Sequence, residues 1–241
     1  MRATAFEFRV RIFIIALIYT LGFFSPWERF IGSGVRTNTW LDLSSGIAAT
    51  TRWLTLGEVT LFVSVCALFL GVAGTVLRVW ATAYMGGATV TDSKMMAGGI
   101  VASGPYRHVR NPLYLGTWLL SFPIALLMPV SGAIFVLIAI FVFELRLILG
   151  EEAFLVGKLG PIYEDYKLRV PRLIPRILSA VGSAEVRPRW VLAIVAEVFP
   201  VGFTLCFAVL AWRYNAQLLT KCLLICFGVS LIVKAIIQRE K

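Results

Sequence analysis

Residues 112–149 read PLYLGTWLLSFPIALLMPVSGAIFVLIAIFVFELRLIL, which is two apolar runs on either side of a short turn. The turn, residues 128–132, contains Pro and Gly, which typically separate one helix from the next. A membrane-spanning helix needs about 20 apolar residues, so the first run is short for a full crossing. We therefore predict an antiparallel helical hairpin that lies in a membrane, with Pro123 favouring a kink in its first arm.

Composition extends the membrane assignment from the hairpin to the whole chain. The 241 residues are 59% hydrophobic and 15% charged, with a mean hydropathy of +0.85, whereas soluble domains carry about a quarter charged residues. We predict an all-α fold, a polytopic integral membrane helical bundle of about six transmembrane helices in one domain, residues 1–241. The four apolar runs outside the hairpin are residues 12–24, 54–79, 190–212 and 218–237.

The formal net charge of +10 indicates membrane topology rather than binding to nucleic acid. Basic residues accumulate on the cytoplasmic side of membrane proteins. If the N- and C-termini are cytoplasmic, six crossings place residues 81–111, 151–189 and 239–241 inside, and these regions hold most of the Lys and Arg. The sequence therefore predicts a multi-pass protein of the cell membrane (the inner membrane if bacterial). Its polar segments would face the cytoplasm, with residues 30–52 as an outer loop.

Histidine and cysteine usage limits the chemistry that the chain can perform. His108 is the only histidine in the sequence, which excludes mechanisms that need two. The four cysteines all lie in apolar runs. Cys222 and Cys226 would share a helix face, but no histidine or further cysteine lies nearby in the sequence to complete a metal site. Buried thiols are the better interpretation, and no metal site is predicted.

Two polar segments, residues 99–116 and 151–175, are predicted at the same membrane face and carry the candidate chemistry. Pro112 suits the first turn of a helix, where its missing N–H is harmless. The free N–H groups that follow form the positive end of that helix, which favours a carboxylate. With acidic residues at the end of the neighbouring helix, this arrangement suits a zwitterionic ligand.

Acidic and aromatic side chains would complete such a pocket. Glu151 or Glu152 can hold an ammonium or sulfonium group, and Tyr106 and Tyr114 can pack against an adenine, a ribose or a cation. Plainer interpretations of the same residues stay open. The tyrosines suit an interfacial aromatic belt, Glu152 suits a solvated helix end, and Arg110 suits a topology anchor.

A longer pattern of residues around this pocket resembles a known family. The pattern comprises LRVWA (77–81), GPYRHVRNPLYLG (104–116), Glu151-Glu152 and G-x-x-Y-x-x-Y-x-x-x-V-P (160–171). It resembles the conserved C-terminal core of the isoprenylcysteine carboxyl methyltransferase family, which the related phospholipid methyltransferases share. The resemblance covers a methyltransferase-like core at residues 77–175 and leaves residues 190–238 as an additional C-terminal helical pair.

The resemblance implies that S-adenosylmethionine is the cofactor and that it binds on the cytoplasmic side, between the 81–111 loop and the hairpin. Arg146 and Glu152 are the catalytic candidates. Two positions depart from the family pattern, because Asn111 replaces the usual His and Leu147 replaces the arginine expected to orient a substrate carboxylate. The cofactor-contacting positions that the resemblance implies are Ile100, Val101, Tyr106, Asn111, Pro112, Leu113, Tyr114 and Glu151.

The function implied by the resemblance is methyl transfer to a lipophilic acceptor that enters from the bilayer. The acceptor is either the carboxylate of a prenylated cysteine-like substrate, which needs no general base, or a lipid amine, which must lose a proton to Glu152 or His108. The departures at Asn111 and Leu147 leave open a catalytically silent lipid-binding or assembly module with the same fold. A small transporter also stays open because of ionisable residues in the spans, although no inverted repeat is visible. Among those residues, Glu197 is expected to pair within the bundle.

Overall fold

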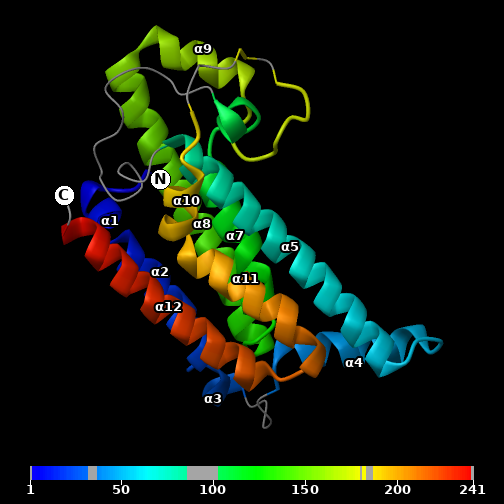
Figure 1. The fold of residues 1–241 in the computed structure, drawn as a ribbon. Helices are drawn as coiled ribbons and strands as arrows, with labels where there is room; N and C mark the ends of the chain where they lie inside the picture. The colour runs from blue at the N-terminus through cyan, green and yellow to red at the C-terminus, as the bar shows by residue number, and fades with distance from the viewer. Residues whose placement is uncertain (1, 32–36, 86–102, 180, 183–186, 240–241) are drawn as a thin grey trace.

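The structure is a computed structural model that describes residues 2–31, 37–85, 103–179, 181–182 and 187–239. All regular secondary structure in these residues is helical, which confirms the predicted all-α class. Long helices lie alongside one another, with α9 beyond one end of the bundle and α3 and α4 at the other (Figure 1). The helices are α1 (Ala5–Arg9), α2 (Arg11–Phe24), α3 (Glu28–Ile31), α4 (Thr39–Thr51), α5 (Leu56–Met85), η1 (Gly104–Arg107), α7 (Pro112–Ala125), α8 (Val130–Leu159), α9 (Pro161–Arg169), α10 (Trp190–Ala196), α11 (Val198–Leu210), η2 (Ala211–Arg213) and α12 (Ala216–Arg239).

The predicted apolar runs all lie in helices, but these helices differ in length. Among the described residues, α5, α8 and α12 are long and apolar enough to cross a membrane. Helices α10 and α11 make a fourth span if they are counted together, although the chain bends by 76° between them. Helices α2 and α7, at the first and third predicted spans, are apolar but have 14 residues each. Length and composition therefore support three or four full crossings, with two shorter apolar helices beside them.

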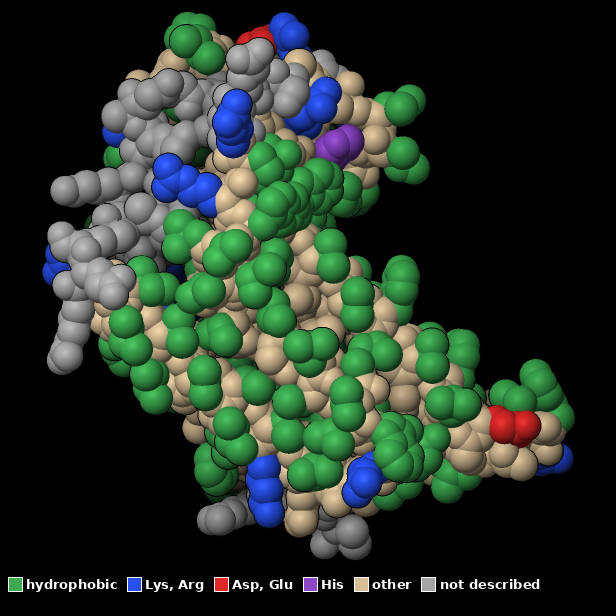
Figure 2. Space-filling model, in the orientation of Figure 1, with side chains coloured by type: hydrophobic (Ala, Val, Ile, Leu, Met, Phe, Trp, Pro, Cys, Tyr) green, Lys and Arg blue, Asp and Glu red, His purple; other side chains and the backbone are tan. Residues whose placement is uncertain are grey.

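The surface of the bundle has the distribution of side chains that a lipid environment requires. Hydrophobic side chains cover the flank of the helical body, whereas Lys and Arg gather mainly at its ends (Figure 2). Many large apolar side chains on α5, α8, α11 and α12 are exposed, as a lipid-facing surface requires. The polar segments before α7 and after α8 lie at one end, with α9.

Helix α4 replaces the outer loop that the sequence predicted for residues 30–52. Asn38 begins the helix, because its side chain accepts a hydrogen bond from the Leu41 N–H at 2.9 Å. The first N–H groups of α4 then satisfy carbonyl groups that the end of α7 leaves free. Thr39 N donates to Met128 O at 2.7 Å and Trp40 N donates to Leu126 O at 3.0 Å. The loop prediction was wrong because the Ser and Thr hydroxyls bond within the helix, as Thr50 does to Gly46 O at 2.8 Å.

The closest helix contact that bears on the site joins α5 to α7. A Cβ on Gly74 would lie 2.6 Å from Gly116 O, so the two backbones touch there without intervening side chains. Small residues such as glycine permit this close approach between membrane helices. Gly116 faces Arg78 in turn, because a Cβ on Gly116 would lie 2.5 Å from Arg78 Cγ. The Arg78 side chain therefore passes directly over the start of α7.

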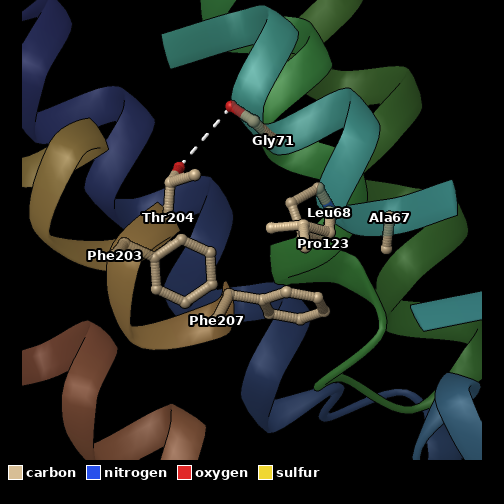
Figure 3. Close-up of a pocket in the computed structure, with 7 residues that line it drawn as sticks. All are labelled: Ala67, Leu68, Gly71, Pro123, Phe203, Thr204 and Phe207. Atoms are coloured by element: carbon tan, nitrogen blue, oxygen red, sulfur yellow. Dashed lines mark hydrogen bonds between the residues drawn. The ribbon is translucent and has the colours of Figure 1, made fainter. Parts of the chain in front are cut away.

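The C-terminal helices pack against the other side of α5. Thr75 and Thr204 share a hydrogen bond of 2.8 Å, and Thr204 also donates to Gly71 O at 3.5 Å (Figure 3). The crevice beside this contact is lined by aromatic and aliphatic side chains from α5, α7 and α11. It has no room for a water molecule, so it is a packing seam between helices rather than a ligand site.

We predict that Gly74→Ala destabilises the protein by about 1–3 kcal/mol, because the new methyl group forces α5 away from α7. Thermal unfolding in detergent measures the loss. Gly57→Ala is the matched control, since it lies in the same helix and a Cβ there meets no atom within 4 Å. Equal melting temperatures for the two variants would contradict the close contact.

Candidate active site

The two polar segments that the sequence predicted to meet do so at one end of the bundle. Tyr166 on α9 donates its phenolic hydrogen to Tyr106 O at 2.7 Å. The N–H of Arg110 donates to Pro171 O at 2.9 Å. Burial raises the pKa of Tyr106 well above its ordinary value, so its phenol is neutral at physiological pH. These bonds hold the segment before α7 against the segment after α8.

Glycine and proline set the turns that bring these segments together. Gly104 has a φ of +56°, a conformation that favours glycine, and a Cβ there would collide with the ring of Tyr84. Gly160 also has a φ of +56° and ends α8, after which Pro161 begins α9. The chain therefore turns sharply at both places and returns toward the start of α7.

Glu152 is the centre of a charged cluster between α8 and these segments. Its carboxylate accepts hydrogen bonds from Arg172 Nη2 at 2.8 Å and from Asn111 Nδ2 at 3.3 Å. Arg110 Nε lies 3.3 Å from Glu152 Oε1 in an ion pair without hydrogen-bond geometry. The side chains of Glu152 and Arg110 are 4% and 8% exposed, whereas that of Arg172 is 39% exposed. The hydrogen bond to Glu152 raises the pKa of Arg172.

The neighbouring carboxylate, Glu151, faces α7 instead. Tyr114 donates its hydroxyl hydrogen to Glu151 Oε1 at 2.8 Å. Asn111 precedes α7 and makes no side-chain cap to it, because its amide donates instead to Glu152 and to Arg172 O. The first N–H groups of α7 have no partner within the helix itself. Pro112 occupies the first turn, as predicted. One end of α7 thus offers hydrogen-bond donors beside a carboxylate.

The structure brings most of the predicted site residues together and leaves some apart. Arg146 contacts α1 rather than the cluster, since its Nη2 lies 2.7 Å from Glu7 Oε1. Leu147 is fully buried in the hydrophobic core. Ile100 and Val101 lie outside the residues that the structure describes. The residues at or beside the start of α7 are Tyr106, Asn111, Pro112, Leu113, Tyr114, Glu151 and Glu152.

Part of this chain is similar to known methyltransferases. Residues 62–161 match the family model described as phospholipid methyltransferase. Protein-S-isoprenylcysteine O-methyltransferase of Schizosaccharomyces pombe is 40% identical over 80 residues, which are 32% of this chain and 34% of that protein. The chain thus spans about a third of the length of this curated relative. No solved structure matches the chain.

The matched region, residues 62–161, contains most of α5 and all of η1, α7 and α8. It therefore includes the start of α7 and both acidic residues of the site. Arg172, which binds Glu152, lies beyond it in the segment after α9. Helices α10, α11 and α12 also lie beyond the matched region, at the C-terminal side of the chain.

Two side chains that the sequence analysis did not place in the site reach it from a distance. Arg172 lies in the predicted polar segment 151–175 but was given no role there. Its position directly after the Val-Pro pair that ends the motif is its local signal. Arg78 is the second, since it donates from Nη1 to Leu113 O at 3.2 Å and to Thr117 Oγ1 at 2.5 Å. A charged residue inside an apolar helix was the signal that could have singled out Arg78.

We expect Glu152→Gln to cost about 3 kcal/mol of stability, because it leaves the buried Arg110 without a counter-charge. Thermal unfolding in detergent measures this. The control is Asp165→Asn, which removes an exposed ion pair to Arg169 whose two side chains are more than half exposed. Such a pair contributes about 0–1 kcal/mol. A Glu152→Gln variant as stable as the control would show that the charged cluster does not hold the two segments together.

Proposed function

We propose that the chain is an integral membrane methyltransferase that transfers the methyl group of S-adenosylmethionine to a lipophilic acceptor. The proposal rests on the agreement between the family match and the position of the candidate site. The family match covers α7 and α8, and the charged and aromatic residues implied as cofactor contacts meet at one end of those two helices.

The residues present fit the proposed cofactor, which has a carboxylate, an ammonium and a sulfonium group. The first N–H groups of α7 would hold the carboxylate, since a helix N-terminus favours an anion. Glu151 would face the cationic groups, with Tyr114 orienting its carboxylate. Tyr106 is buried and neutral beside them and would contact the nucleoside.

Positioning is the main task of the protein in such a reaction. S-adenosylmethionine supplies an already activated methyl group when it is bound. The chain would align this donor with the acceptor and exclude water, and alignment alone can supply roughly 7–11 kcal/mol of the barrier. Glu152 already binds Arg172 and Asn111, so in this arrangement it orients Asn111 at the start of α7.

Two acceptor classes follow from the family, and each makes a different demand on the chain. A prenylated cysteine-like carboxylate needs no base but needs a cationic partner, and Arg146 is already paired with Glu7. A lipid amine needs a proton acceptor, for which Glu152 and His108 are the candidates. The apolar part of either acceptor would enter between helices from the bilayer, whose hydrocarbon the exposed apolar side chains of the bundle would contact.

The first test is calorimetric binding of S-adenosylmethionine to purified protein in detergent or nanodiscs. We expect micromolar binding, and at least tenfold weaker binding for Glu151→Gln, because a hydrogen bond to a charged group contributes about 1.5–3 kcal/mol. Glu164→Gln is the matched control, since Glu164 is an exposed acid on α9. It should bind as the wild type does.

A folded wild type that binds no S-adenosylmethionine would instead support a catalytically silent lipid-binding or assembly module. The burial of Leu147 and the pairing of Arg146 are the observations that favour this alternative.

The acceptor class is tested by transfer of a labelled methyl group. Purified protein in nanodiscs would receive labelled cofactor and either a prenylated cysteine or a lipid with a primary amine head group. We expect label in one of the two organic extracts and none with Glu151→Gln. Label in neither extract, together with tight cofactor binding, would rule out both acceptor classes.

A further inference from the structure

Glu197 lies outside the matched region, at the break between α10 and α11 where the chain bends by 76°. Its side chain is 2% exposed. Its two carboxylate oxygens accept hydrogen bonds from Arg78 Nε at 2.7 Å and Arg78 Nη2 at 3.1 Å, both on α5. Thr82, one turn further along α5, donates to Glu197 Oε1 at 2.8 Å. The predicted pairing of Glu197 within the bundle is therefore confirmed.

The guanidinium of Arg78 has a second set of partners on α7. While Nε and Nη2 bind Glu197, Nη1 donates to Leu113 O at 3.2 Å and to Thr117 Oγ1 at 2.5 Å. Thr117 also donates to Leu113 O at 3.0 Å. One planar group thus connects the α10–α11 break to the first turns of α7, and its fork geometry makes the two sets of bonds interdependent.

The packing around Arg78 leaves this side chain little freedom. Its aliphatic part passes over Gly116, where a Cβ would lie 2.5 Å from Arg78 Cγ. Its side chain is 20% exposed, so the surrounding protein covers most of it. Among the described residues, other ionisable groups that interact electrostatically with it are Tyr19, Tyr106, Glu144 and Lys234. Glu197 is the partner that binds it through two oxygens.

We propose that Glu197 is a positioning residue for the cofactor end of α7, acting through Arg78. This inference rests on the proposed function. Leu113 lies between Asn111 and Tyr114, which contact Glu152 and Glu151 respectively. Without the charge of Glu197, the guanidinium loses its fixed orientation and the anchor on Leu113 and Thr117 loosens. The donors at the start of α7 then lose their alignment with Glu151.

This inference gives the additional C-terminal helices a specific task. They contribute to the site from outside the matched region, through a contact between residues 78 and 197, which are 119 positions apart in the sequence. A purely structural ion pair would only attach α10 and α11 to α5. A positioning pair also controls α7, a helix that Glu197 does not touch directly in the described contacts.

The test compares Glu197→Gln with Thr204→Val in nanodiscs. Thr204→Val weakens the docking of α11 on α5 through Thr75 without altering the bonds of Arg78. We expect both variants to melt below the wild type. Only Glu197→Gln should weaken S-adenosylmethionine binding by fivefold or more, and Thr204→Val should stay within twofold. Equal affinities for the two variants would overturn the proposal.

A double variant separates positioning from stability. Arg78→Met combined with Glu197→Leu replaces the buried ion pair by apolar side chains, a change that often restores stability. We expect its melting temperature to exceed that of Glu197→Gln while its cofactor affinity stays weak, because the anchor on Leu113 is lost. Recovery of affinity together with stability would show that the pair is structural only.

Amide hydrogen exchange gives a readout that does not depend on the cofactor. Glu197→Gln should speed exchange in the peptide covering residues 113–117, and Thr204→Val should not. A wild type that binds no S-adenosylmethionine would overturn the proposed function, while this exchange measurement would still decide whether Glu197 controls the start of α7. Unchanged exchange in Glu197→Gln would refute that control.

Discussion

The contact between α5 and α7 at Gly74 and Gly116 is the constraint on which the site depends. Two helices that approach this closely can pack only through small residues, and the approach fixes the rotation of each helix relative to the other. That rotation puts Arg78 over the start of α7 and turns Tyr114 toward α8. The charged cluster around Glu152 then closes the same end of the bundle. The geometry of the site thus depends on two glycines that have no side chain, Gly74 and Gly116.

Most of the fold was predictable from the sequence because lipid imposes a simple rule on it. Apolar runs have to be helical, and Pro or Gly has to separate them, so the hairpin turn before α8 and the spans around α5 and α12 were correctly predicted. Helix α4 was not, because its Ser and Thr residues look like a loop until their hydroxyls bond to the helix backbone. The bend at Glu197 was also missed, although the charged Glu197 interrupts the apolar run and Pro200 lies in the first turn of α11, where proline is tolerated.

The site was predictable only where it is local in sequence. The motif from Tyr106 to Tyr114 and the pair Glu151-Glu152 predicted that two segments meet, and they do. The side chains that bind those residues were harder to predict. Arg172 and Arg146 are both arginines near the acidic pair in the sequence, yet one binds Glu152 and the other turns to Glu7. Which arginine binds Glu152 depends on the rotation of α8 and on the path of the chain after α9. Neither can be inferred from the sequence pattern around a single residue.

Helix α8 has a length that bears on where the two reactants of the proposed reaction would meet. Val130 and Glu151 are 21 residues apart, and at 1.5 Å per residue the helix rises about 32 Å between them. The hydrocarbon layer of a bilayer is about 30 Å thick. A helix that enters at Val130 therefore brings Glu151 to the opposite phase boundary. At this boundary the water-soluble methyl donor can stay in water while the lipophilic acceptor stays in the bilayer. The concentration of acceptor that the site meets is then its density in the leaflet, not its concentration in bulk water.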